Sequence, residues 1–248
     1  MNLILVLAFS TCAFGRTLSK DKIVGGTVAS EGQFPYQISQ RYNSRHRCGG
    51  SIIDEHTILS AAHCVHGISG DKFKIVVGSN QLSSGGLWYS VSRYVMHEQY
   101  DSNLLTDDIA VIKVLDPIQF TTHIQPVVVD DTFISADVEC VLSGFGTTSY
   151  PGNASNDLLY FEGNVFDFNK CKEVFAEDNF PVLESNICAF SKNGIGACSG
   201  DSGGPLVSNQ KQIGIASWVD PCGVGDPDVF TRVSYYYDWI TTQQLKTY

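Results

Sequence analysis

The chain has 248 residues, of which 43% are hydrophobic and 17% charged, and its formal net charge is −10 at pH 7. This is enough apolar sequence to form a substantial core, so we expect one globular domain or two tightly joined halves rather than a disordered chain. The negative charge, with no basic run to offset it locally, argues against nucleic acid as a partner.

The first 15 residues have the pattern of a secretory signal peptide. Leu3 to Phe9 form a short apolar run, and Ala13 and Gly15 supply small residues of the kind that signal peptidase selects, although the usual positive charge is missing. The run is far shorter than the roughly 18 to 20 apolar residues that a membrane-spanning helix needs. We therefore expect a secreted protein with no membrane segment.

From Ile23 onward, the chain consists of short runs of β-forming residues separated by glycines and polar turns. Residues 36–39, 73–77 and 109–115 are examples, and such runs predict an all-β domain. The end of the chain differs, because residues 235–245 carry apolar side chains at helical spacing and predict a helix.

Two segments have the composition of connections. Residues 118–131 contain proline and polar residues that interrupt the strand pattern, so we expect them to join an N-terminal half to a C-terminal half. Residues 147–157 are rich in Gly, Ser, Asn and Pro and predict an exposed loop. That loop contains the sequon Asn153-Ala154-Ser155, which makes Asn153 a candidate glycosylation site.

Three short motifs contain residue types that cooperate in nucleophilic catalysis. Residues 200–205 place Ser202 among glycines, which let the backbone approach a substrate and direct N–H groups at one point. Residues 59–64 place His63 among small neighbours that leave its ring accessible, whereas the other histidines, His46 among them, are interpreted as structural or surface residues. The third motif is residues 107–112, where an acidic residue precedes an apolar strand. A carboxylate at this place needs a partner, because burying it unpaired is costly.

Together, these motifs resemble those of the chymotrypsin family of serine proteases. Their order along the chain is histidine, aspartate, serine, and Ile-Val-Gly-Gly stands at residues 23–26. The resemblance implies an acyl-enzyme mechanism with Ser202 as the nucleophile and His63 as the general base. Asp108, rather than its neighbour Asp107, matches the residue that orients the histidine.

The resemblance extends over residues 23–246 and implies an all-β fold of two antiparallel Greek-key β-barrels with a C-terminal helix. The barrels would take up about residues 23–126 and 127–234 of a peptidase domain at residues 23–248. The active site would lie between them.

Further roles follow from the same resemblance. The backbone N–H groups of Gly200 and Ser202 would form the oxyanion hole, and Ser217 would support the catalytic aspartate. Residues 16–22 would be an activation peptide.

Activation would require cleavage after Lys22 by a trypsin-like enzyme. The freed amino group of Ile23 would then pair with Asp201 and order the loop that holds the nucleophile. We therefore expect the precursor to be an inactive zymogen.

Seven cysteines remain once Cys12 leaves with the signal peptide, and the tight Cys-x-x-Cys pairs of a zinc site are lacking. The family pairing implies the disulfides Cys48–Cys64, Cys171–Cys188 and Cys198–Cys222. Cys140 would remain a buried free thiol, because Ser208 occupies the usual partner position, a pattern that resembles insect digestive chymotrypsins.

The specificity pocket leaves alternatives open. Gly196 stands at the base, where trypsin-like enzymes carry an aspartate, so simple trypsin specificity is disfavoured. Val219, after Trp218, should narrow the entrance, whereas Asp228 adds a carboxylate that could attract a basic side chain or stay hydrogen-bonded in the wall. We expect cleavage after apolar residues, with an elastase-like preference for small side chains or broad collagenolytic-type specificity as alternatives.

No metal and no cofactor are expected. Calcium-binding relatives place glutamates in the loop that corresponds to Gly78–Leu87, which has no acidic residue here. The expected partners are protein or peptide substrates, an activating trypsin-like protease and protein protease inhibitors, and we expect a monomer that acts in digestion. A silent relative that only binds is disfavoured because the triad is complete, and a cascade protease because the propeptide is so short.

Overall fold

The computed structural model describes residues 24–68, 72–149, 151–177, 180–219 and 222–246. The expected signal peptide at residues 1–15, the activation peptide at residues 16–22, Lys22 and Ile23 lie outside these described residues. Within the described ranges, no helix is long and apolar enough to cross a membrane.

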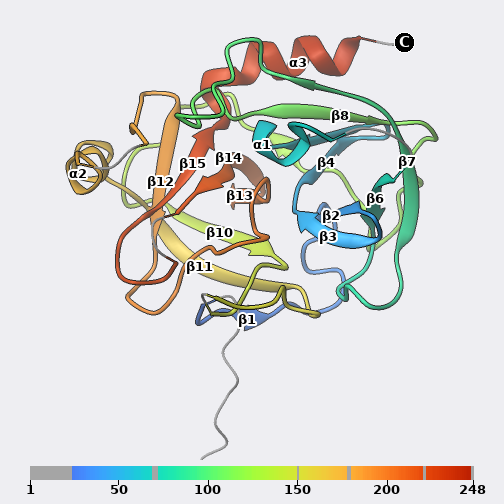
Figure 1. Ribbon diagram of the computed structural model, residues 1–248, viewed down its shortest axis with the longest axis horizontal. Helices are drawn as coiled ribbons and strands as arrows, with labels where there is room; N and C mark the ends of the chain where they lie inside the picture. Colours follow the sequence, from blue (N-terminus) through green and yellow to red (C-terminus); the bar gives the residue numbers. More distant parts are fainter. Residues whose placement is uncertain (1–23, 69–71, 150, 178–179, 220–221, 247–248) are drawn as a thin grey trace, which may run out of the picture.

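The first barrel is built from seven strands in the order β3-β2-β6-β7-β8-β5-β4 (Figure 1). These strands are β2 (Ile38–Tyr42), β3 (Arg45–Cys48), β4 (Ser51–Asp54), β5 (Thr57–Ser60), β6 (Phe73–Val77), β7 (Leu87–Met96) and β8 (Ala110–Val114). Because side chains alternate between the faces of a strand, inward isoleucines meet across the sheet, as Ile58 of β5 does with Ile112 of β8. Ile38, Ile58, Ile75 and Ile112 are at most 1% exposed and belong to one core.

The second barrel contains eight strands, seven of them in the order β1-β11-β10-β13-β14-β15-β12. Its strands are β1 (Thr27–Val28), β9 (Val128–Val129), β10 (Glu139–Gly144), β11 (Leu159–Phe166), β12 (Asn186–Phe190), β13 (Pro205–Ser208), β14 (Lys211–Trp218) and β15 (Asp228–Arg232). β12 also pairs with β11, which closes the barrel around Leu142, Leu206 and Phe230. The expectation of an all-β fold with two barrels is confirmed.

The expected division of the chain differs from the structure at its first strand. β1 lies within residues 23–126, yet it pairs with β11 of the second barrel, with Thr27 opposite Tyr160 and Val28 opposite Leu159. The backbone edge of β11 gains hydrogen bonds from this pairing, which a strand edge left unpaired would lack. The N-terminal strand therefore ties the beginning of the chain to the second barrel.

The C-terminal helix expected at residues 235–245 is present as a 3₁₀ turn, η1 (Val233–Tyr236), followed by α3 (Tyr237–Leu245). Two short helices were not predicted, α1 (Ala62–Val65) and α2 (Phe168–Val174). α2 begins where the side chain of Asp167 accepts a hydrogen bond from the N–H of Lys170 at 2.9 Å, a helix N-cap.

A shared core joins the two barrels. Leu59 and Ile109 from the first barrel pack with Ile215 of β14 and with Ile240 of α3, and all four side chains are fully buried. The barrels therefore meet through packed apolar side chains, which gives residues from both halves fixed positions where they face each other.

Candidate active site

His63 and Asp108 meet because they lie at the same end of two paired strands. α1, which carries His63, follows β5 directly, and Asp108 precedes β8, which pairs with β5 through Ser60 opposite Ala110. The Nδ1 atom of His63 lies 2.8 Å from Oδ2 of Asp108, and the backbone N–H of His63 donates to Oδ1 at 2.9 Å. Asp108 thereby holds both the ring and the backbone of this histidine.

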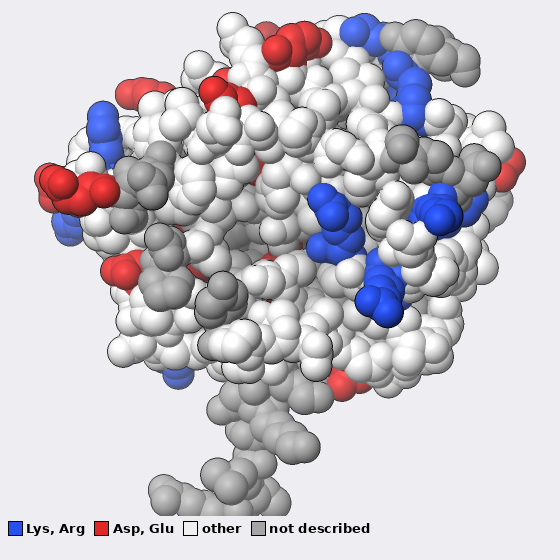
Figure 2. Space-filling view, viewed as in Figure 1, with Lys and Arg blue, Asp and Glu red and all other residues white. Residues whose placement is uncertain are grey.

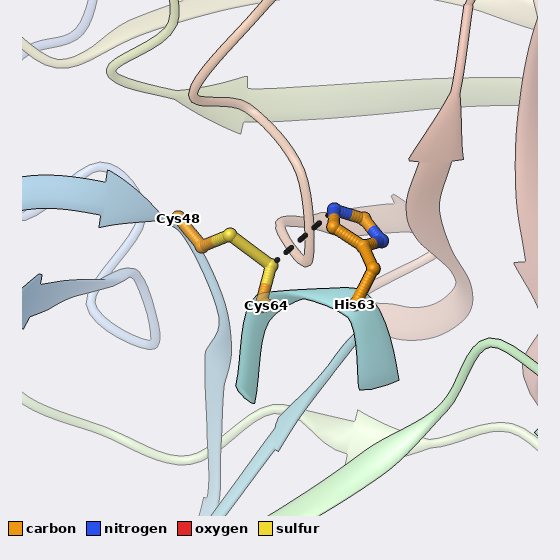
Figure 3. Close-up of side chains that lie close together, drawn as sticks. All are labelled: Cys48, His63 and Cys64. Carbon is orange, nitrogen blue, oxygen red and sulfur yellow. Dashed lines mark hydrogen bonds between the residues drawn. A yellow bond between two sulfur atoms is a disulfide. The ribbon is translucent and has the colours of Figure 1, made fainter. Parts of the chain in front are cut away.

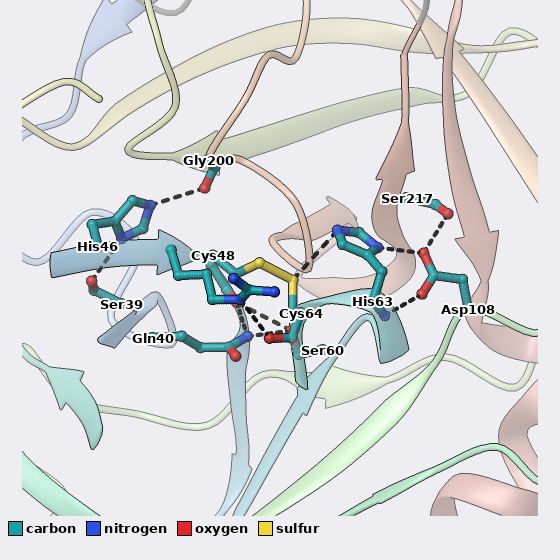
Figure 4. The surroundings of a disulfide bond; sticks show 12 residues. Ser39, Gln40, His46, Cys48, Ser60, His63, Cys64, Asp108, Gly200 and Ser217 are labelled. Carbon is teal, nitrogen blue, oxygen red and sulfur yellow. Dashed lines mark hydrogen bonds and ion pairs between the residues drawn. A yellow bond between two sulfur atoms is a disulfide. The ribbon is translucent and has the colours of Figure 1, made fainter. Parts of the chain in front are cut away.

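Asp108 is only 1% exposed, and the second barrel supplies its remaining partners. Ser217 of β14 donates its hydroxyl to Oδ2 at 2.6 Å (Figure 4). Thr231 of β15 donates its hydroxyl to the Asp108 carbonyl at 2.7 Å. Since a carboxylate only accepts hydrogen bonds, Nδ1 of His63 carries a proton and Nε2 has a free lone pair. This arrangement makes Nε2 available as a base.

The loop of residues 200–204, which contains Ser202, lies close to Ser60 of β5 and to Cys64, the residue after this histidine. The N–H of Gly49 donates to the carbonyl of Ser202 at 2.8 Å, and the N–H of Gly203 donates to that of Ala216 at 2.7 Å. A Cβ atom on Gly203 would lie 2.1 Å from Oγ of Ser60, so only glycine lets the loop approach β5 this closely.

Two N–H groups of this loop stand out because their neighbours are paired. Asp201, Gly203 and Gly204 donate their N–H groups to backbone carbonyls, whereas those of Gly200 and Ser202 have no hydrogen-bond partner among the described residues. Gly200 has φ +101°, a left-handed conformation that suits glycine. Two free donors on either side of one residue can bind an oxyanion.

The half-buried hydroxyl of Ser202 makes no hydrogen bond to His63 within the described part of the chain. Among the described residues, Nε2 has a hydrogen-bond contact with Sγ of Cys64 at 3.6 Å. Catalytic hydrogen bonds are often long before substrate binds, and they tighten in the complex, so this geometry is compatible with proton transfer between the two side chains.

The comparisons with known proteins agree with this arrangement. The sequence profile of the family described as Trypsin matches residues 23–240. The chain belongs to this family of serine proteases. It is 40% identical to Chymotrypsin-2 of Vespa crabro, over 90% of this chain and 100% of that protein. It is 33% identical to Trypsin delta of Drosophila melanogaster, over 97% of this chain and 98% of that protein.

A solved structure with the same fold is neuropsin, a serine protease expressed in the limbic system of mouse brain. It superposes with a TM-score of 0.82 at 29% identity, covering 88% of this chain and 98% of that chain. The resemblance to chymotrypsin-like serine proteases is therefore confirmed, and the chain is a proteolytic enzyme that acts on proteins.

In this protease, three potential metal donors lie within 4.8 Å of one another: Cys48, His63 and Cys64 (Figure 3). Both sulfur atoms are joined in a disulfide, which leaves neither as a thiolate ligand. The cluster is explained by the position of this disulfide against His63.

Asp201 is fully buried next to Ser202 in the chain. Its Oδ1 accepts the N–H of Gly146 at 2.7 Å, and its Oδ2 accepts that of Cys198 at 3.0 Å. Burial raises the pKa of Asp201 to about 7, although both hydrogen bonds oppose the shift. A Cβ atom on Gly144 or on Gly146 would lie 2.1 Å from a carboxylate oxygen, so the protease needs glycine at both positions to house this side chain.

The sequence analysis did not assign His46 to the site. Its Nδ1 lies 2.8 Å from the hydroxyl of Ser39, and its Nε2 lies 2.9 Å from the carbonyl of Gly200 (Figure 4). Burial lowers the pKa of His46 to about 4, so the ring is neutral and fixes the peptide beside the free N–H groups. The sequence signal is weak, because a histidine in a strand between two arginines is normally a surface residue.

Of the residues expected to form the pocket, the structure brings Gly196 and Asp228 together. Trp218 is buried against the rings of Phe175 and Phe180, at 4.9 and 5.6 Å between centroids. A Cβ atom on Gly196 would lie 3.2 Å from both carboxylate oxygens of Asp228, so this carboxyl group lies directly against the glycine. Val219 is half-buried and packs against the barrel core.

Asp228 is 5% exposed, and its Oδ2 accepts the N–H of Ala197 at 2.8 Å. Burial raises the pKa of Asp228 to about 8, and the nearby charge of Asp201 adds to the shift. At neutral pH the carboxyl group is therefore mostly protonated.

The structure contains three disulfides, Cys48–Cys64, Cys171–Cys188 and Cys198–Cys222, which are those implied by the family. Cys140 is a buried free cysteine, and burial raises the pKa of its thiol to about 12, which disfavours the reactive thiolate. Ser208 donates its hydroxyl to the carbonyl of Glu139, beside that thiol. Asn153 is exposed in its loop, and its glycosylation stays a prediction.

Proposed function

We propose that this protease is a secreted endopeptidase that forms an acyl-enzyme on Ser202. The observation that carries the proposal is the fixed His63–Asp108 pair next to a loop in which the N–H groups of Gly200 and Ser202 have no partner among the described residues. Ser202 attacks the scissile carbonyl while Nε2 of His63 takes its proton, and the oxyanion binds the N–H groups of Gly200 and Ser202. His63 returns the proton to the leaving amine, and water then hydrolyses the ester by the same steps.

The buried carboxyl group of Asp201 supports synthesis as a zymogen. It accepts two N–H groups but has no cationic partner among the described residues, and a buried carboxylate favours one. Cleavage between Lys22 and Ile23 would create an amino group that supplies this charge. The ion pair would stabilise the 200–204 loop in its active conformation and would switch on catalysis.

The expected preference for apolar residues before the cut is supported by the pocket. Trp218 and Val219 would line it with apolar surface, and the raised pKa of Asp228 keeps its carboxyl group mostly neutral at physiological pH. The name Chymotrypsin-2 of one relative favours the same specificity, whereas other relatives are named trypsins. An elastase-like preference and broad collagenolytic-type specificity are the alternatives.

The pocket predicts that specificity changes with pH. Asp228 is neutral below its pKa of about 8 and charged above it, so the ratio of kcat/KM for Lys over Phe before the cut is expected to rise about tenfold as the pH increases through this value. Taking the ratio cancels the titration of the triad. In Asp228→Ser the ratio should stay flat, and a slope that persists in this variant would assign the effect to another group.

Labelling of the nucleophile tests the proposed reaction directly. The purified precursor is treated with trypsin and then with a fluorophosphonate, and peptide mapping is expected to find the label on Ser202 only after cleavage at Lys22. Ser202→Ala serves as the control that removes the nucleophile but keeps the fold. Equal labelling before and after cleavage would refute the zymogen, and no labelling in either state would refute the catalytic assignment.

Activated protease, tested on a peptide library, identifies the residue preferred before the cut. Cleavage after Phe, Tyr or Leu is the expected result, whereas cleavage after Ala would favour the elastase-like alternative. Extracellular digestion of proteins, and control by protein protease inhibitors that occupy the same site, complete the proposed function.

A further inference from the structure

Strand β3 presents two arginines to solvent beside the active site. Arg45 and Arg47 are both exposed, whereas His46 between them turns inward to the carbonyl of Gly200, as expected from the alternation of side chains along a strand. Neither arginine forms an ion pair with a described residue. We call this pair the β3 arginines.

The position of Arg47 is fixed relative to the catalytic histidine. Its Nε donates to the carbonyl of Cys64 at 2.9 Å, and Cys64 is the residue next to His63 in α1. Arg47 also precedes Cys48, which forms the disulfide with Cys64. The guanidinium group therefore lies at the rim of the site, on the side of this disulfide.

The chemistry of the reaction identifies which part of the substrate passes this rim. The ring of His63 faces Asp108 with Nδ1 and the Cys48–Cys64 disulfide with Nε2 (Figure 4). Nε2 gives its proton to the leaving amine, so that amine lies on the disulfide side. The residue before the cut enters the pocket of the second barrel at Gly196. The segment after the cut therefore leaves over β3.

The backbone of β3 can accept such a segment. Among the described strands, β3 is an edge strand that pairs with β2 alone, and no described strand covers its outer edge, which could accept an extended peptide. At about 3.3 Å per residue, the β3 arginines are roughly 7 Å apart along the strand, which equals the spacing of alternate side chains in an extended peptide. Two arginines at this spacing can contact two alternate residues of the leaving segment.

The charge around β3 differs in sign from that of the whole chain. Although the net charge is −10, Lys and Arg side chains gather over β2, β3 and β6 beside the hollow between the barrels, and no acidic side chain of a described residue is visible among them (Figure 2). Arg41 of β2 and Lys74 of β6 lie opposite each other, and both hydrogen-bond to neutral groups. The local field therefore favours an anionic ligand.

We propose that the β3 arginines make this protease select substrates with Asp or Glu among the first four residues after the scissile bond. The inference rests on the proposed function, because it assigns the leaving side from the reaction of Ser202 and His63. Guanidinium groups bind carboxylates in a fixed bidentate geometry, so the selection acts on charge and on position.

The test uses quenched fluorescent peptides that share one sequence before the cut and carry Asp, Ala or Lys at each of four positions after it. For the trypsin-activated protease, the ratio of kcat/KM with Asp to kcat/KM with Lys at the preferred positions is expected to be roughly ten. High salt should lower this ratio, because it screens the charges. In Arg45→Gln/Arg47→Gln the ratio should fall to about one. In Arg45→Glu/Arg47→Glu it should reverse.

Lys170→Gln/Lys172→Gln is the matched control, because it removes two exposed positive charges from α2, at the outer edge of the second barrel (Figure 1). It should keep the preference of the parent. A second substrate joins the same segment before the cut to a small fluorescent amine as the leaving group. All variants should hydrolyse this amide at equal rates, since it has no residues after the cut that could reach β3.

The outcomes separate the two proposals. If the amide is hydrolysed but the parent treats Asp and Lys alike, or if the β3 variants keep the preference, the inference is wrong and the proposed function stands. If the amide is not hydrolysed and Ser202 is not labelled, the proposed function is wrong, and the inference fails with it.

Discussion

Asp108→Asn is expected to lower kcat about 10⁴-fold while leaving the fold intact. The carboxylate accepts hydrogen bonds from Nδ1 and the backbone N–H of His63 and from the hydroxyl of Ser217. An asparagine amide would turn its NH₂ group toward one of these donors. The histidine would then favour the wrong tautomer, with its proton on Nε2, and could not accept the proton of Ser202. The effect on catalysis is measured as kcat for a peptide amide, and the effect on the fold is measured separately by thermal unfolding.

Asp107→Asn is the matched control for this change. Asp107 is the adjacent acid, and its Oδ1 accepts a hydrogen bond from the hydroxyl of Tyr236 at 2.8 Å, outside the triad. Its φ of +50° is a left-handed conformation that asparagine also adopts readily. Activity should stay within about threefold of the parent. Equal losses in the two variants would show that the triad assignment is wrong.

Gly146→Ala is expected to reduce the activity of the cleaved protease by at least about 100-fold. The new Cβ atom would lie 2.1 Å from Oδ2 and 2.6 Å from Oδ1 of Asp201, and it would force the carboxylate away from the N–H groups of Gly146 and Cys198. Asp201 directly precedes Ser202, so its movement displaces the nucleophile and the oxyanion hole together. Overpacking of this kind should also lower the free energy of unfolding by about 1–3 kcal/mol, as measured by denaturant titration.

Gly67→Ala separates this clash from the general effect of replacing a glycine. Gly67 has φ +72°, and a Cβ atom there would have no neighbour within 4 Å. The variant should lose only about 1 kcal/mol from the strained backbone and should retain full activity. A fully active Gly146→Ala protease would mean that the loop can shift to accommodate the methyl group without disturbing Ser202.

The sequence predicted those features that depend on short motifs. Ser202, His63 and Asp108 each lie in a local pattern, and their order along the chain carried the family resemblance and, with it, the two barrels. The four-residue helix α1 could not be predicted, because it is too short to produce a periodic pattern. For α2, the sequence signal is limited to its N-capping residue, Asp167.

Other features depend on contacts between distant segments, which no local pattern reports. β1 joins the second barrel because the edge of β11 is available to it, and that edge exists only in the folded chain. His46 functions through a carbonyl 154 positions away in the sequence. A role for the β3 arginines in substrate selection follows from their place beside the disulfide of Cys64. The overall negative charge of the chain did not predict a positively charged surface there.

The proposed triad is divided between the barrels, which has a consequence for how the protease loses activity. Asp108 belongs to the first barrel, but its hydroxyl partners Ser217 and Thr231 belong to the second, and Ser202 is held to the first barrel through Gly49. Any separation of the barrels breaks all of these links at once, even if each barrel keeps its own core. Activity of this protease therefore requires that the two barrels stay in contact, and inactivation can precede the unfolding of either barrel.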